Sequence, residues 1–179
     1  MGRKKTIDRD ELLDTAELII RTHGAAGLTI DSLAKAADIT KGGVQYTFSS
    51  KQAIIDAIME RWFESYTELY TKLAGENPAP TDSLKAHIEA TRLEEQPTDA
   101  KSAGIMAALL QSPDDLEGSR VWYQERLKVF DLNTDAGRNL RMLFYATEGL
   151  FMLKQMRLAD VSDKEWDIML KHILAAAST

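Results

Sequence analysis

The spacing of apolar residues along the first part of the chain follows the period of an α-helix. From about residue 7 to 23, apolar side chains such as Leu12 and Ala16 recur three or four positions apart, which predicts an amphipathic first helix. Thr29 is a good N-cap residue that stands before a second apolar run, so a second helix is predicted from there to about residue 36. The chain therefore begins with two amphipathic helices that can share an apolar core.

A third, shorter helix is predicted after a tight turn. The turn falls around Asp38, a residue type that tolerates the left-handed backbone such turns often need. Thr40 can cap the new helix, and Val44 and Phe48 are spaced four apart, so both can face inward. Three other side chains of this helix would then point outward: Lys41, Gln45 and Tyr46.

Two adjacent glycines in this short helix need an explanation. Gly42 and Gly43 each cost roughly 1 kcal/mol of helix stability relative to alanine. Close approach of the backbone to another surface would compensate, and phosphates at a helix N-terminus are such a surface. The alternative is a helical hairpin that only looks like a DNA reader. Caps, glycines, an aromatic ring and lysines occur together here, which favours a reader of the DNA major groove.

The same segment resembles the DNA-binding domain of the TetR/AcrR family of bacterial transcriptional regulators. The resemblance is strong over about residues 7–60 and only architectural beyond them. It rests on these positions: Gly27, Thr29, Leu33, Ala34, Ala37, Ile39, Thr40, Gly42, Tyr46, Phe48 and Lys51. The chain departs from the pattern at Asp38, Gln45 and Thr47, where glycine, tyrosine and histidine are common. These departures bear on the operator sequence, because the amide of Gln45 can pair with an adenine edge.

The predicted partner of this domain is a double-stranded, (pseudo)palindromic DNA operator. The residues predicted to contact it are Thr29, Thr40, Lys41, Gly42, Gly43, Gln45, Tyr46, Thr47 and Lys51. The net charge is −6, yet residues 1–51 carry eight Lys or Arg against seven Asp or Glu, so the acidic excess lies in the remainder. The arm Arg3-Lys4-Lys5 either touches the DNA backbone or is a solvated terminus. So few cations imply that affinity depends on dimerisation.

Helical patterns continue to the end of the chain without strand-like alternation. A long fourth helix is predicted from about residue 50 to 74, and the helix-breaking segment 75–80 separates it from the rest. Further helices are predicted at about 81–93, 99–111, 113–132, 134–158 and 162–177. The predicted fold is all-α with about nine helices. It comprises a helix-turn-helix domain at 1–50 and, as the resemblance implies, a helical ligand-sensing and dimerisation domain at 51–179.

The last two predicted helices indicate self-association. Apolar residues occur on nearly every face of the first and along a broad stripe of the second. Both helices either pack wholly into the protomer core or, as the resemblance implies, contribute half of a two-fold four-helix interface. The residues predicted for this homodimer interface are Gly149, Leu150, Leu153, Trp166, Met169, Leu170 and Ile173. A two-fold dimer suits half-sites about one turn of DNA apart.

Aromatic and methionine side chains between these regions indicate a ligand chamber. The residues predicted to line it are Trp62, Tyr66, Met106, Leu110, Trp122, Arg126 and Phe144. Apolar walls with a few polar groups are what small-molecule pockets need, although such a stripe is more often plain core. His87 and Glu148 are candidate polar groups inside, with core or surface satisfaction as the alternative. The resemblance implies a small-molecule effector without identifying it.

An enzyme is the competing class, and the sequence lacks its usual parts. It has no cysteine, three histidines, no serine in a nucleophile-elbow context and no phosphate-binding glycine loop. We therefore predict no enzymatic activity, no cofactor and no metal site. No apolar run reaches the roughly 18 residues of a membrane span, and no signal peptide precedes Ile7. A cytoplasmic protein without a membrane partner is expected.

The predicted function is a ligand-responsive dimeric transcriptional regulator, a repressor according to the habits of the resembled family. A small-molecule effector would release it from its operator, with the fourth helix transmitting the state of the chamber to the reading head. The alternative is a helix-turn-helix-derived interaction protein whose DNA binding is lost or non-specific. Gln45, Thr47 and the weak positive charge of the head leave that alternative open.

Overall fold

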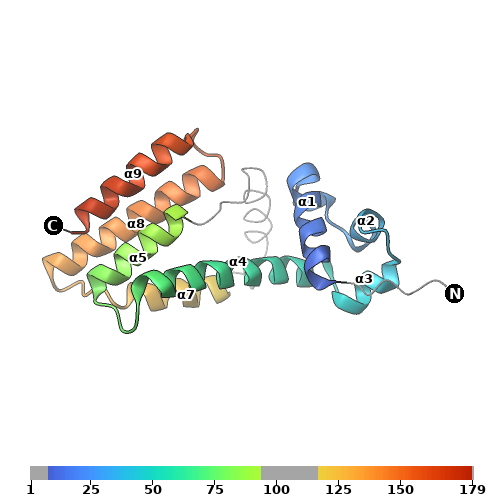
Figure 1. Ribbon diagram of the computed structural model, residues 1–179, viewed down its shortest axis with the longest axis horizontal. Helices are drawn as coiled ribbons and strands as arrows, with labels where there is room; N and C mark the ends of the chain where they lie inside the picture. Colours follow the sequence, from blue (N-terminus) through green and yellow to red (C-terminus); the bar gives the residue numbers. More distant parts are fainter. Residues whose placement is uncertain (1–7, 94–116, 179) are drawn as a thin grey trace.

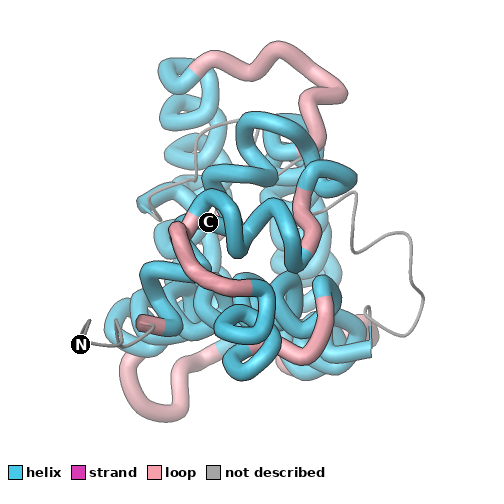
Figure 2. Tube along the Cα trace, turned by 90° about the vertical axis from the view of Figure 1, so that its right-hand side faces the viewer, coloured by secondary structure: helices cyan, strands magenta, loops and turns pink. Residues whose placement is uncertain are grey.

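The computed structural model describes residues 8–93 and 117–178, and every regular element in them is an α-helix (Figure 1, Figure 2). The elements are α1 Arg9–Gly27, α2 Ile30–Ala36, α3 Lys41–Thr47, α4 Lys51–Ala74, α5 Pro80–Leu93, α7 Glu117–Leu127, α8 Asp135–Gln155 and α9 Asp163–Ala176. The all-α prediction is confirmed for this part of the chain. The helix predicted at 99–111 and the beginning of the one at 113–132 lie outside the described residues.

Side-chain caps set the beginnings of the helices. Thr29 and Ser32 form a reciprocal capping box at α2, in which Thr29 Oγ1 accepts from the Ser32 amide at 2.9 Å and Ser32 Oγ accepts from the Thr29 amide at 2.8 Å. Other helices begin after hydroxyl caps of the same kind, at Thr40, Ser50, Thr134 and Ser162. Local sequence therefore determines where these helices start.

Helix ends follow the sequence less closely. Gly24, with φ 71°, interrupts α1 where the amphipathic pattern predicts its end, and a short helical turn follows. α8 ends at Gln155, earlier than predicted, because Arg157 adopts a left-handed backbone with φ 55°. α7 ends at Leu127, also earlier than predicted. The Asp131 carboxylate accepts from a backbone amide two residues on, which favours a turn there over a longer helix.

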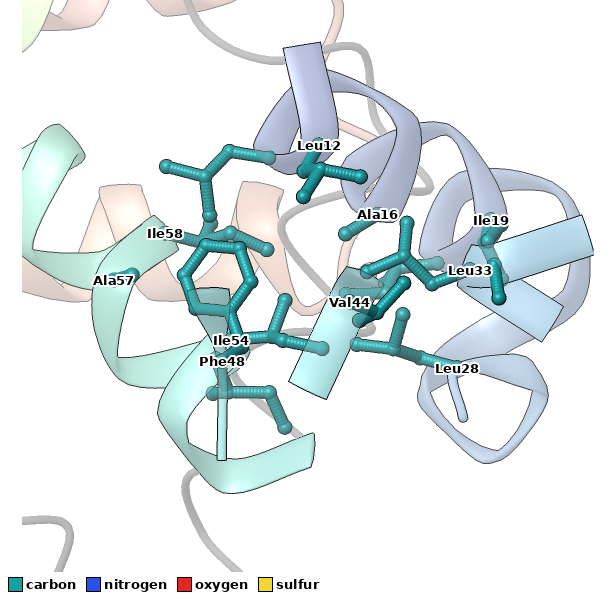
Figure 3. Close-up of a cluster of buried hydrophobic side chains, with 14 residues drawn as sticks. Leu12, Ala16, Ile19, Leu28, Leu33, Val44, Phe48, Ile54, Ala57 and Ile58 are labelled. Carbon is teal, nitrogen blue, oxygen red and sulfur yellow. The ribbon is translucent and has the colours of Figure 1, made fainter. Parts of the chain in front are cut away.

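The reading head, which we define as α1, α2, α3 and the first half of α4, encloses one apolar core (Figure 3). Leu33 from α2, Val44 from α3 and Ile58 from α4 are all 0% exposed within it. Figure 3 shows these side chains converging with Leu12 and Ala16 of α1. The inward side of α3 packs in this core, and its opposite side does not contribute to the core.

A second apolar core lies at the other end of α4, among α5, α8 and α9 (Figure 1). Ile88 of α5, Phe144 of α8 and Leu170 of α9 are almost wholly enclosed there. We call this part the helical body. The two cores are separate clusters, and α4 passes from one to the other, so α4 is the element through which they can communicate.

An ion pair fastens α4 to α1. Arg61 Nη2 donates to Glu17 Oε1 at 2.6 Å, and the Trp62 indole N–H donates to the same oxygen at 3.2 Å. Arg61 Nη1 also reaches the more exposed Asp14 carboxylate at 2.8 Å. Burial alone would lower the pKa of Arg61, but hydrogen bonds and charge from Glu17 and Asp14 raise it above its usual value, so the guanidinium stays charged.

Candidate functional site

The third helix, α3, is apolar on the side that faces the core and polar on the side that faces away. Val44 and Phe48 are 0% and 3% exposed, whereas Tyr46 is 93% exposed. Lys41 and Gln45 are also exposed. The inward and outward sides predicted from the sequence are therefore confirmed, and a row of hydrogen-bonding side chains faces solvent.

The turn before α3 has the predicted backbone. Asp38 adopts φ 54°, in the left-handed region, and the amide of Ile39 donates to the carbonyl oxygen of Ala34 at 3.0 Å. Thr40 Oγ1 then accepts from the Gly43 amide at 3.1 Å and caps α3. The turn and the cap together fix the angle at which α3 leaves α2.

Two of the predicted DNA-contacting cations already have contacts within the head. Lys41 Nζ lies 3.0 Å from the Asp31 carboxylate in an exposed ion pair, which adds little stability. Lys51 Nζ donates to the carbonyl oxygen of Ala25 at 2.5 Å and so ties α4 to the end of α1. Each ammonium has three N–H donors, so both retain donors for a phosphate.

The remaining predicted contact residues differ in exposure. Thr29 and Gly42 are exposed, while Gly43 and Thr47 are half-buried. A Cβ atom added at Gly42 would meet no atom within 4 Å, so the fold itself does not require glycine there. The absent side chain leaves room for another surface to approach the first turn of α3.

Replacing Gly42 with alanine is expected to raise the free energy of unfolding by up to about 1 kcal/mol, because alanine is the better helix former. The same methyl group should weaken DNA binding, because it would stand between the helix and the phosphates. Urea unfolding and fluorescence anisotropy measure the two effects. Gly118→Ala is the control, since Gly118 also lies in a helix, α7, and a Cβ atom added there would meet no atom within 4 Å. It should stabilise without changing DNA affinity; an equal loss of affinity in both variants would contradict the interpretation.

A chain of polar side chains joins α4 and α7 to α5 and α8 of the helical body. Tyr66 of α4 and His87 of α5 are hydrogen-bonded, with the hydroxyl 2.6 Å from Nδ1. His87 Nε2 lies 3.0 Å from Glu148 Oε1 of α8, out of line for a directed hydrogen bond. The Tyr123 hydroxyl of α7 donates to Glu148 Oε2 at 2.5 Å. The two candidate polar groups, His87 and Glu148, therefore lie within the body, where they contact Tyr66, Tyr123 and each other.

Both phenols of this chain stay protonated. Burial raises the pKa of Tyr66, and the nearby Arg126 guanidinium offsets part of that rise. Burial also raises the pKa of Tyr123, with a further increase from the Glu148 carboxylate. Because Tyr123 keeps its proton, it acts as a stable donor to Glu148.

The predicted ligand-lining residues divide into three groups. Tyr66, Trp122, Arg126 and Phe144 come together in the helical body, where Phe144 stacks on His87 with ring centroids 4.4 Å apart. Trp62 instead packs against the reading-head core, because its indole is held by Glu17. Met106 and Leu110 lie outside the described residues. Tyr70, one turn after Tyr66 on α4, joins this group without having been predicted, and its ring lies under the Arg126 guanidinium.

The predicted interface residues also divide. Trp166, Leu170 and Ile173 are 6%, 0% and 7% exposed and pack in the core of the helical body, so they serve the protomer itself. Leu150 is half-buried against the same core. Leu153 and Met169 are 42% and 40% exposed, and a Cβ added at Gly149 would meet open space. The exposed apolar side chains that sequence analysis missed on α8 and α9 are Met142, Tyr145 and Ile168.

Two family models match the chain at positions that correspond to these two parts. Residues 12–58 match bacterial regulatory proteins of the tetR family. Residues 81–178, more than half of the 179, match the tetracyclin repressor-like C-terminal domain. The chain belongs to the TetR family. It is a transcriptional regulator of that family, and α2, α3 and most of α1 lie in the segment that matches the N-terminal model.

Individual relatives match this TetR-family chain over about a third of its length. An uncharacterized HTH-type transcriptional regulator in the dhlA 5'region of Xanthobacter autotrophicus is 33% identical over 63 residues, 35% of this chain and 31% of that protein. The HTH-type transcriptional repressor NemR of Escherichia coli (strain K12) is 34% identical over 65 residues, 36% of this chain and 33% of that protein. The matches thus span about a third of the length of either relative.

Solved structures share the whole fold of this TetR-family chain. A TetR-family transcriptional regulator from Rhodococcus sp. has a TM-score of 0.71 over 96% of this chain and 98% of that one, at 15% identity. This likeness concerns the fold alone. Within residues 8–93 and 117–178, none of the helices combines the length and apolar character that crossing a bilayer requires.

Proposed function

We propose that this TetR-family chain is a dimeric, effector-responsive repressor that binds a (pseudo)palindromic operator through α3. The observation that carries the proposal is the division of α3, in which Val44 and Phe48 anchor the helix while Tyr46 stands 93% exposed. The side chains around Tyr46 suit DNA: Lys41 can neutralise a phosphate and Gln45 can pair with an adenine edge. The head would dock as a rigid unit because its core is independent of the exposed face.

The first test is fluorescence anisotropy on DNA from just upstream of the protein's own gene, with unrelated DNA as competitor across a salt series. We expect binding that survives the competitor and weakens about tenfold on Lys41→Ala or Tyr46→Ala, since each variant removes a charged or phosphate-directed hydrogen bond. Lys128→Ala, an exposed lysine after α7, is the control and should leave affinity unchanged. Affinity that is the same for every sequence and follows salt alone would contradict operator recognition. That result would favour the alternative function, a helix-turn-helix-derived interaction protein that has the same fold but does not recognise a DNA sequence.

The dimer proposal rests on an exposed apolar stripe of α8 and α9. Met142, Tyr145, Gly149 and Leu153 recur at helical spacing on α8 and therefore share one face. α9 packs beside α8, and its Met169 is 40% exposed. Gly149 lets a second backbone approach closely, which is what two crossing helices at a two-fold interface need. Two joined heads could then reach successive major grooves.

Leu153→Glu is expected to weaken dimerisation at least tenfold, because it buries a carboxylate in an apolar interface. Leu73→Glu on α4 is the matched control: both leucines are 42% exposed, and both variants add one negative charge. Light scattering after size-exclusion chromatography measures the oligomeric state over a concentration series. Dimers of equal strength in the two variants would place the interface elsewhere.

Effector release would pass through α4. Neighbouring residues of this helix face the two parts: Trp62 is held by Glu17 of the head, and the Phe63 ring lies 6.0 Å from the Trp122 ring of the body. A ligand that moves α7 against α4 would therefore shift the position of the head, and the coupling would be reciprocal. DNA affinity that is identical with and without every ligand shown to bind would contradict this step.

A further inference from the structure

Two buried N–H donors on α7 have no hydrogen-bond partner among the described residues. They are the indole Nε1 of Trp122 and the guanidinium Nε of Arg126. The two residues are four apart on one helix, so their side chains share a face. A buried donor without a partner loses its hydrogen bonds to water without replacement, and protein structures rarely leave two such donors together. Because neither group can accept a hydrogen bond, both require an acceptor.

Arg126 is held by aromatic rings and not by a carboxylate. Its Cζ lies 4.0 Å from the ring centroid of Trp122, 4.5 Å from that of Tyr70 and 5.5 Å from that of Tyr66. In the part of the chain that the structure describes, no Asp or Glu forms an ion pair with it. The rings fix the guanidinium by cation–π contact and leave its charge without a neighbouring anion.

The carboxylate of the same cluster is already engaged. Glu148 Oε1 faces His87 Nε2, and Oε2 accepts from the Tyr123 hydroxyl. None of the hydrogen bonds or ion pairs that Glu148 forms with the described residues goes to either of the two donors on α7. A cationic ligand would have to displace Arg126 from its rings and would still leave the indole N–H without an acceptor. The unsatisfied groups thus favour a ligand that brings negative charge and oxygen acceptors.

We propose that this cluster binds an amphipathic carboxylate. One carboxylate oxygen would accept from Arg126 Nε and from Trp122 Nε1, and the apolar part of the ligand would lie against the aromatic rings of Phe63, Tyr66 and Trp122. Charge-assisted hydrogen bonds to guanidinium are the strong ones, so the head group would determine affinity. That carboxylate binding releases DNA rests on the proposed effector function. The binding of the carboxylate does not depend on that function.

The test uses three ligands that differ only in the head group: 2-naphthoate, 2-naphthylmethanol and 2-naphthylmethylammonium. The same comparison is repeated with octanoate, octanol and octylammonium, so that the shape of the apolar part does not decide the result. Isothermal titration calorimetry on the full chain without DNA should give at least tenfold tighter binding of the carboxylate than of the alcohol in one of the two series. Weaker binding is expected for the cation.

Variants assign the preference to the two donors. Arg126→Met keeps the apolar stem and should abolish the tenfold preference for carboxylate over alcohol, while leaving alcohol binding within about twofold. Trp122→Phe keeps an aromatic ring but removes the N–H, and should reduce carboxylate affinity about fivefold, as expected for one neutral donor. Lys128→Met also removes one positive charge, but Lys128 is exposed after α7, so this variant should leave the affinity for all the ligands unchanged. Circular dichroism establishes that each variant is folded before binding is interpreted.

The outcomes separate this proposal from the proposed function. Carboxylate binding that depends on Arg126 but leaves DNA affinity unchanged would support the site and contradict effector release. DNA release by the alcohol or the cation, with no carboxylate preference, would support effector release and overturn the site. Failure of all six compounds to bind would overturn the site, because neither a carboxylate nor an apolar group would then be recognised there.

Discussion

Gly137→Ala is expected to lower the free energy of unfolding by about 3 kcal/mol, as overpacking against rigid backbone does. Gly137 is buried in the first turn of α8, and a Cβ built there would lie 2.0 Å from the carbonyl oxygen of Asp131. The neighbouring backbone cannot easily yield. The Gly137 amide donates to the Thr134 hydroxyl at 3.0 Å, and the Thr134 amide donates to that same Asp131 carbonyl at 3.2 Å. Urea unfolding followed by far-ultraviolet circular dichroism measures the loss.

The control for this prediction is Gly118→Ala in α7. A Cβ there meets nothing within 4 Å, so the methyl group should stabilise the helix by up to about 1 kcal/mol. If Gly137→Ala lowers the free energy of unfolding and Gly118→Ala raises it, the loss at Gly137 is due to the close approach of residue 131. Equal stability of Gly137→Ala and the unaltered protein would show that α8 begins farther from that turn.

The reading head could be predicted from the sequence because its determinants are local. Thr29 and Thr40 cap the helices that follow them, and the four-residue spacing of Val44 and Phe48 identifies the buried side of α3. Asp38 adopts the left-handed turn that its residue type allows. Each of these signals acts within a few residues, so no knowledge of distant contacts is required.

The interior of the helical body could not be predicted in the same way, because its pairings join distant parts of the chain. Nothing in the sequence connects Tyr66 to His87, or His87 to Glu148. Apolar periodicity identifies an apolar stripe but not what covers it. The stripe therefore predicts Trp166 and Leu170 for the dimer interface, whereas the structure buries both in the core of the protomer.

Trp62 illustrates the same limit within α4. It precedes Phe63 directly, and both are aromatic, so sequence alone gives no reason to assign them to different parts of the molecule. The structure turns Trp62 toward Glu17 in the head and Phe63 toward Trp122 in the body, because adjacent helix positions point about 100° apart. Contacts of α4 with the head and with the body therefore occur at adjacent residues, Trp62 and Phe63.

Arg61→Met is expected to lower the free energy of unfolding by about 2 kcal/mol, because it removes the cation that faces the Glu17 carboxylate. The Glu17 side chain is 7% exposed and its contact with Arg61 Nη2 measures 2.6 Å. Breaking a fully buried pair costs more, but the Arg61 side chain is 30% exposed, and solvent screening reduces the effect. Chemical unfolding at neutral pH measures the change.

Two companion variants distinguish the buried half of this ion-pair network from the exposed half. Asp14→Asn removes the other carboxylate that Arg61 contacts, and because the Asp14 side chain is 72% exposed, the loss should stay below about 1 kcal/mol. Glu17→Met combined with Arg61→Met should recover most of the stability lost in Arg61→Met alone, since an apolar pair can replace a buried ion pair at little cost. If the double variant is less stable than Arg61→Met, then Glu17 stabilises the head mainly through Trp62 and its other contacts, and the charge on Arg61 is secondary.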